Sequence, residues 1–166
     1  MSRAFVKETD GEELDDGAPE RPVSPHPNYV TPAGLAQLQA RVAELTAERQ
    51  RLLGDESVGA KQQLRRVERE LRYYDERVVS AIPVDPAARS GDRVHFGATV
   101  EVEDEAGNVQ RYSIVGEDEA DAAHGKISWV SPLARALLNA EAGDTVTWKR
   151  PAGDKELHIL AIHPYR

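Results

Sequence analysis

The 166-residue chain contains no cysteine. This absence excludes disulfide bonds, thiolate metal sites and a cysteine nucleophile, and it fits a reducing compartment. No apolar run reaches the roughly 18 residues that a membrane-spanning helix needs, and the first residues lack the apolar core of a signal peptide. We therefore expect a cytoplasmic, soluble protein that does not contact a membrane.

An excess of basic residues is also lacking, because 21 Lys and Arg stand against 29 Asp and Glu and the net charge is -8. Such a chain does not bind duplex DNA by neutralising phosphates over its whole surface, so any contact with nucleic acid must come from a local patch. The five histidines show neither metal-ligand spacing nor a known catalytic pattern.

Residues 1–30 contain little that could form a core. They carry seven acidic and three basic side chains, and prolines at positions 22, 25 and 27 favour an extended backbone. This composition predicts a disordered acidic, proline-rich arm over residues 1–30.

A helical hairpin is predicted over residues 31–82. Thr31 and Pro32 have the form of an N-cap followed by proline at the first helical position. Two apolar stripes on spacings of three and four follow, and two glycines, Gly54 and Gly59, bound a short turn between them. The first stripe contains Leu35, Leu38, Val42, Leu45 and Leu52, with Arg49 at one seam position, and the second contains Ala60, Leu64, Val67, Leu71, Tyr74 and Val78. This pattern predicts an antiparallel coiled coil, which prolines 83 and 86 end.

Beyond a linker at residues 83–92, the apolar period changes from helical spacing to alternation. Five strands are predicted, over residues 99–103, 109–115, 126–130, 145–149 and 155–163. Ser131 and Pro132 predict the start of a short helix that covers the sheet. The fold class is therefore α+β, with a helical hairpin followed by an antiparallel β domain over residues 93–166.

Several segments of this β domain resemble a known family. They read FGATVEV at residues 96–102, IVGEDEAD at 114–121, IS at 127–128, SPLARALL at 131–138 and GD at 143–144. In this order they resemble the C-terminal domain of the transcription elongation factors GreA and GreB, and YVTPAG at residues 29–34 is similar to the start of that family's helical hairpin.

The resemblance implies an FKBP-like C-terminal fold that binds bacterial RNA polymerase at the rim of its secondary channel, while the hairpin inserts toward the active centre. Asp118, Glu119, Asp121, Ser131 and Pro132 are the contacts with polymerase that it implies; the alternative for each is an ordinary loop or helix-cap role. The chain would act as a monomer through the polymerase active site and would not be an enzyme itself. Prolyl isomerase activity is not expected, because fold does not carry function and only two phenylalanines exist to line a proline pocket.

In the family, two acidic residues at the hairpin tip help to hold a magnesium ion at which polymerase cleaves backtracked RNA. Asp55 and Glu56 are the corresponding candidates, and carboxylates are suitable magnesium ligands. The tip differs from the family, because Val58 stands in the place of a glutamate and Gly59 in that of an asparagine, and the hairpin is shorter than is typical. Two interpretations stay open: a cleavage factor, or a module that binds the same channel without cleavage. Ordinary turn chemistry is the structural alternative for both acids.

The second helix also carries a basic stripe, made of Lys61, Arg65, Arg69 and Arg72. One interpretation is contact with nascent RNA or polymerase through phosphate attraction. The other is a solvated face that is stabilised by pairs such as Glu68 with Arg72.

Overall fold

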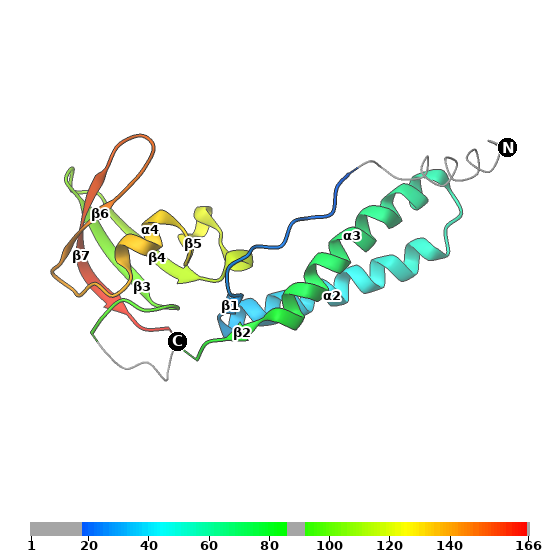
Figure 1. Cartoon of the computed structure of the whole chain (residues 1–166), viewed down its shortest axis with the longest axis horizontal. Helices are drawn as coiled ribbons and strands as arrows, with labels where there is room; N and C mark the ends of the chain where they lie inside the picture. Colours follow the sequence, from blue (N-terminus) through cyan, green and yellow to red (C-terminus); the bar gives the residue numbers. More distant parts are fainter. Residues whose placement is uncertain (1–17, 86–91, 166) are drawn as a thin grey trace. The chain divides into compact units, whose positions relative to one another are not determined.

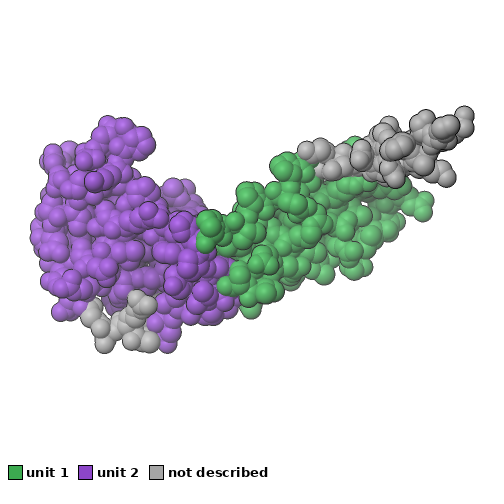
Figure 2. All heavy atoms as spheres, in the orientation of Figure 1, with its two compact units in different colours: residues 1–25, 38–80 green, residues 26–37, 81–166 purple. Residues whose placement is uncertain are grey.

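The computed structural model describes residues 18–85 and 92–165. Most of the predicted arm and linker, residues 1–17 and 86–91, therefore lies outside the described residues. The chain forms two compact units (Figure 2), the first from residues 1–25 and 38–80 and the second from residues 26–37 and 81–166. Within the described residues, no helix combines the length and the apolar composition that crossing a membrane requires.

The first unit contains a helical hairpin. Helix α2 (Pro32–Leu53) contributes its residues from 38 onward, and α3 (Val58–Ser80) runs beside it in the opposite direction (Figure 1). The hairpin core consists of Leu45, Leu52, Ala60 and Val67, with Leu64, Leu71 and Tyr74 packed against it. The predicted hairpin and its two apolar seams are confirmed.

Arg49 occupies a seam position between Leu45 and Leu52. Its guanidinium Nε lies 3.5 Å from a carboxylate oxygen of Glu68 on the facing helix. An interhelical ion pair therefore fills the place where an apolar residue would continue the seam.

The second unit is built on a five-stranded sheet in the order β5-β4-β3-β7-β6. Its strands are β3 (Thr99–Asp104), β4 (Val109–Val115), β5 (Lys126–Ser128), β6 (Thr145–Trp148) and β7 (Lys155–His163). Helix α4 (Pro132–Leu137) follows Ser131, whose side chain accepts a hydrogen bond from the Ala134 backbone N–H at 3.2 Å. The predicted helix start and all five strands are confirmed, with small differences at the strand ends.

The prediction of a wholly antiparallel sheet is wrong at one pairing. Strand β5 pairs with β4 in parallel, in the register Ser113 to Lys126. Two 3-10 turns, η2 (Glu117–Glu119) and η3 (Ala122–His124), take the place of a hairpin turn and bring the chain back beside Ser113, so that β5 runs along the last three residues of β4. The α+β class itself is confirmed.

The core of the second unit lies between the sheet and α4. It joins Val100, Val102, Ile114 and Ile159 of the strands to Leu133, Ala134 and Leu137 of the helix, together with Val94, Phe96 and Leu157. These strand residues lie on one face because side chains alternate along a strand.

A second, two-stranded sheet joins the segments that flank the hairpin. Strands β1 (Tyr29–Val30) and β2 (Ile82–Pro83) pair in parallel, and the N–H of Ile82 donates to the carbonyl of Asn28 at 2.8 Å. The Tyr29 ring also packs against Trp129, with centroids 5.1 Å apart. This pairing has no signal in the sequence, since two-residue strands carry no readable alternation.

Candidate functional site

The hairpin tip presents two carboxylates to solvent, since Asp55 and Glu56 are both exposed. The Ser57 backbone N–H donates to Asp55 Oδ1 at 2.9 Å, and the Ser57 hydroxyl accepts from the Ala60 N–H at 3.2 Å as the cap of α3. The hydrogen bonds from Ser57 lower the pKa of Asp55. Asp55 therefore stabilises the turn through its hydrogen bond to Ser57. Its carboxylate is also an anion that could serve as a metal ligand.

These two carboxylates fit magnesium only as part of a shared site. Their oxygens are the hard donors that magnesium prefers, but the ion takes six ligands and two side chains supply a minority of them. Within residues 18–85 and 92–165, no group of three or more acidic or histidine side chains is placed to hold a metal. A second macromolecule, or water, would have to complete the coordination.

Two apolar side chains flank the acidic pair. Leu53 and Val58 are 51% and 73% exposed. Val58 thus presents an apolar, uncharged side chain to solvent next to the acidic pair.

The basic stripe is partly neutralised by the chain's own N-terminal segment. The Glu20 carboxylate accepts two hydrogen bonds from Arg72, at 3.1 Å from Nε and 2.5 Å from Nη2, and these bonds lower the pKa of Glu20. Glu68, the partner that helical spacing predicts for Arg72, instead lies in ion-pair distance of Arg49. An open groove of about 390 Å³ lies between this segment and α3, beside Arg65 and Arg69.

The five predicted polymerase contacts lie in the η2–η3 loop and at the start of α4, and the structure gives them different surroundings. Asp121 is exposed, and its carboxylate lies 2.6 Å from Nδ1 of His124, which lowers the pKa of Asp121. Pro132 is exposed, Asp118 is half-buried, and the Ser131 hydroxyl caps α4.

Glu119 differs from the other four, because it is buried and accepts a hydrogen bond from the Thr31 hydroxyl. Its side chain is therefore held inside the second unit by Thr31, unlike those of Asp121 and Pro132.

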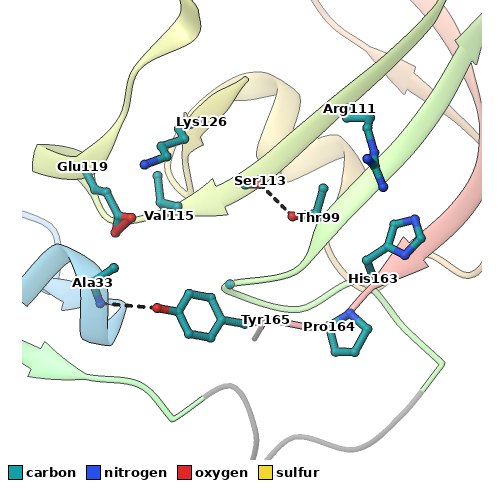
Figure 3. A pocket seen from close by; sticks show the side chains of 11 residues that line it. Ala33, Thr99, Arg111, Ser113, Val115, Glu119, Lys126, His163, Pro164 and Tyr165 are labelled. Carbon is teal, nitrogen blue, oxygen red and sulfur yellow. Dashed lines mark hydrogen bonds between the residues drawn. The ribbon is translucent and has the colours of Figure 1, made fainter. Parts of the chain in front are cut away.

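A cavity of about 540 Å³, which the sequence did not predict, lies in the second unit beside β3, β4 and the end of β7 (Figure 3). Its wall includes the hydrogen-bonded hydroxyls of Thr99 and Ser113, 2.7 Å apart, and the Tyr165 phenol, which accepts from the Ala33 N–H at 3.3 Å. Lys126 and His163 add further polar groups. A cavity assembled from residues 33 to 165 leaves no local signal in sequence, and its polar wall does not resemble an aromatic proline pocket.

Comparison with known proteins identifies the family. A sequence model described as "Transcription elongation factor, GreA/GreB, C-term" matches residues 89–164. A transcription elongation factor GreB from Neisseria meningitidis serogroup B is 38% identical over 151 residues, which cover 81% of this chain and 93% of the relative. The chain belongs to the GreA/GreB family of transcription elongation factors.

The chain is also similar to other GreA/GreB proteins. A GreA from Anaeromyxobacter sp. is 44% identical over 104 residues, covering 62% of this chain and 63% of the relative. Among solved structures, the GreA factor homolog 1 protein of Thermus thermophilus is 28% identical and covers 83% of this chain and 99% of its own, with a TM-score of 0.40. A GreA/GreB factor from Nitrosomonas europaea is 20% identical and covers 81% and 98%, also with a TM-score of 0.40.

Proposed function

We propose that this GreA/GreB family member regulates transcript elongation by binding bacterial RNA polymerase at its secondary channel, in the cytoplasm and as a monomer. The observation that carries the proposal is the exposed pair Asp55 and Glu56 at the end of a hairpin in a chain of this family. Helix α3 has 23 residues, and at about 1.5 Å per residue it is roughly 35 Å long. We propose that a hairpin of this length carries the two carboxylates toward the polymerase active centre.

The η2–η3 loop and the start of α4 are the proposed docking surface for polymerase. Asp121 and Pro132 are exposed and present a charge and a rigid apolar ring, with Asp118 and Ser131 beside them. For Glu119, buried against Thr31, we propose a supporting role that holds the loop in place.

At the tip, Asp55 and Glu56 would contribute oxygen ligands to a magnesium ion that is shared with the polymerase. A divalent ion of this kind activates water and offsets charge on a leaving oxygen. The chain's own part is to present two anions and, through the Ser57 hydrogen bonds, to keep Asp55 ionised and fixed in direction. The reaction would take place in the polymerase, so the chain is not itself the enzyme.

A second candidate function is binding without cleavage, and the exposed Val58 favours it. Val58 lies where the family has a glutamate, and its 73% exposed side chain brings no charge to the tip. A factor of this kind would occupy the channel, modulate pausing or initiation and compete with cleavage factors.

Stalled, backtracked elongation complexes with labelled RNA separate the two functions. If the chain is a cleavage factor, the wild type releases 3′ fragments, Asp55→Ala abolishes their release and Glu56→Gln reduces it. If it is a non-cleaving module, the wild type releases none but blocks a known cleavage factor, and Val58→Glu is the variant expected to gain cleavage.

Docking is tested separately by the affinity for polymerase. Asp121→Lys should weaken binding several-fold, whereas Asp154→Lys, the same charge reversal at an exposed turn of the same domain, should not. Equal affinities of the wild type and both variants would exclude the η2–η3 loop as the docking surface, and no binding by the wild type would refute both candidate functions.

A further inference from the structure

Two consecutive residues of the N-terminal segment, Glu20 and Arg21, contact α3 through different chemistry. Glu20 pairs with the guanidinium of Arg72 through two hydrogen bonds. The Arg21 guanidinium carbon lies 3.9 Å from the centroid of the Tyr73 ring, and its Nη1 lies 3.2 Å from both the Tyr74 hydroxyl and the Glu70 carboxylate. An anion therefore occupies Arg72 while a planar group covers the neighbouring aromatic ring.

Arg72 and Tyr73 together have the two properties by which proteins bind single-stranded nucleic acid. A guanidinium accepts a carboxylate or a phosphate through the same pair of parallel hydrogen bonds. A tyrosine ring stacks a base as it stacks a guanidinium plane. The open groove that Arg72 lines also contains Arg65 and Arg69 of α3, with Glu68 as the one acidic side chain that α3 contributes to it.

We propose that this face of α3 binds a nucleotide of single-stranded nucleic acid, with phosphate on Arg72 and base on Tyr73, and that Glu20 and Arg21 occupy the same two positions as an internal competitor. The inference rests on one of the two interpretations of the basic stripe, contact with nascent RNA, and deepens it. It adds Tyr73 as a stacking residue and gives the segment before the hairpin a regulatory role.

The contact has the weak character that a displaceable occupant needs. The side chains of Glu20 and Arg72 are 62% and 59% exposed. Exposed ion pairs contribute little to stability and are screened by salt. A nucleic-acid strand that supplies several phosphates and a base can therefore replace the segment. An acidic peptide would match Arg72 but would leave Tyr73 without a planar group to stack.

Fluorescence anisotropy of a labelled oligouridylate with the full chain tests the competition. Glu20→Gln should tighten binding by about two- to fivefold, the gain expected from removing one exposed competing ion pair. Glu141→Gln is the matched control, because Glu141 forms an exposed ion pair with Arg93 at 3.0 Å and its loss changes the net charge equally. The control should stay near the wild-type affinity.

Arg21→Ala gives the sharper result, because it removes a positive charge and yet should tighten binding by uncovering Tyr73. Arg93→Ala, which removes the same charge elsewhere, should not tighten it. In the Glu20→Gln background, Arg72→Ala should abolish the gain, and Tyr73→Ala should weaken binding about fivefold or more while Tyr73→Phe retains it. Thermal melting of each variant confirms that it is folded.

Several outcomes would overturn the proposal: Glu20→Gln binding no tighter than Glu141→Gln, Arg21→Ala binding more weakly than the wild type, or Tyr73→Ala having no effect. Oligothymidylate of equal length shows whether the strand is RNA or DNA. Stronger binding of a duplex, or equal displacement by polyglutamate, would exclude recognition of a stacked single strand. The anisotropy assay contains no polymerase. A negative result in it would refute the nucleic-acid site without refuting the proposed binding to polymerase, which the docking experiment tests separately.

Discussion

The Thr31 hydroxyl donates a hydrogen bond to the Glu119 carboxylate in the interior of the second unit. Residue Thr31 is 0% exposed and residue Glu119 is 8% exposed. The same hydroxyl oxygen accepts from the Gly34 backbone N–H at 2.9 Å. One side chain therefore caps α2 and satisfies a buried carboxylate from the η2 turn, 88 residues away in sequence.

Replacing Thr31 by valine keeps the shape of the side chain but removes both hydrogen bonds. A lost N-cap and a buried carboxylate without its donor should together lower the free energy of unfolding by roughly 1–3 kcal/mol. Urea unfolding followed by tryptophan fluorescence measures this change, because Trp129 packs on Tyr29 in the same unit. Thr31→Ser retains the hydroxyl and should stay close to the wild type; equal stability of Thr31→Val would refute the role of the bond.

Two glycines should respond in opposite directions to alanine. A Cβ at Gly116 would overlap the carbonyl oxygen of Tyr29 in β1, whereas a Cβ at Gly59 in the first turn of α3 meets nothing within 4 Å. Gly116→Ala should cost roughly 1–3 kcal/mol through steric strain, and Gly59→Ala should stabilise by up to about 1 kcal/mol through helix propensity. Denaturant midpoints of the two variants test this, and a destabilised Gly59→Ala would contradict the open space at the tip.

The seam of the hairpin should become more stable when Arg49 is replaced by leucine. The change exchanges an interhelical ion pair with Glu68 for apolar burial between Leu45 and Leu52. We expect a gain of about 1 kcal/mol, because a partly exposed ion pair contributes little to stability and a buried leucine contributes more. Far-UV circular dichroism melts measure the gain. Glu68→Gln removes the pair alone and should change stability only slightly; a loss of stability in Arg49→Leu would show that the ion pair holds the seam.

Asp104 should make the β domain sensitive to acid. Its carboxylate accepts from the Asn108 backbone N–H at 2.9 Å and pairs with Lys155 at 3.1 Å, and these contacts lower the pKa of Asp104 from 3.8 to about 2. Because the folded state favours the charged form, the contribution is complete above the ordinary pKa and is lost as the pH falls from about 4 to about 2.

Melting temperatures at two pH values test the Asp104 contribution. Asp104→Asn should melt below the wild type near neutral pH, and the difference should disappear near pH 2. Glu105→Gln, in the same turn, is the control and should have little effect at either pH. A difference between Asp104→Asn and the wild type that persists in acid would mean that the charge is not responsible.

Local patterns in the sequence were sufficient for most elements of the fold. The start of α4 was predictable because Ser131 and Pro132 cap a helix through contacts within four residues. The hairpin was predictable because two stripes of apolar residues at helical spacing must bury each other. The parallel direction of β5 was not, because it depends on how η2 and η3 return the chain, and these turns have no strong local signal.

The candidate sites also include one part that the sequence predicted and one that it did not. The resemblance to the family's hairpin tip made Asp55 and Glu56 candidates, and their exposure was predictable because a turn exposes its side chains. The partners of the basic stripe were not found, because Glu20 and Arg72 are 52 residues apart and meet only after the chain has folded.

The sequence by itself determined the α+β class, the hairpin with its acidic tip, and the family, because these depend on short-range periodicity and ordered motifs. Only the tertiary structure decided that Glu119 is buried on Thr31, that β1 pairs with β2, and that Glu20 and Arg21 cover Arg72 and Tyr73. Each of these joins residues far apart in the chain. Hydrogen bonds and ring contacts between such residues depend on packing geometry, which no local pattern of residues encodes.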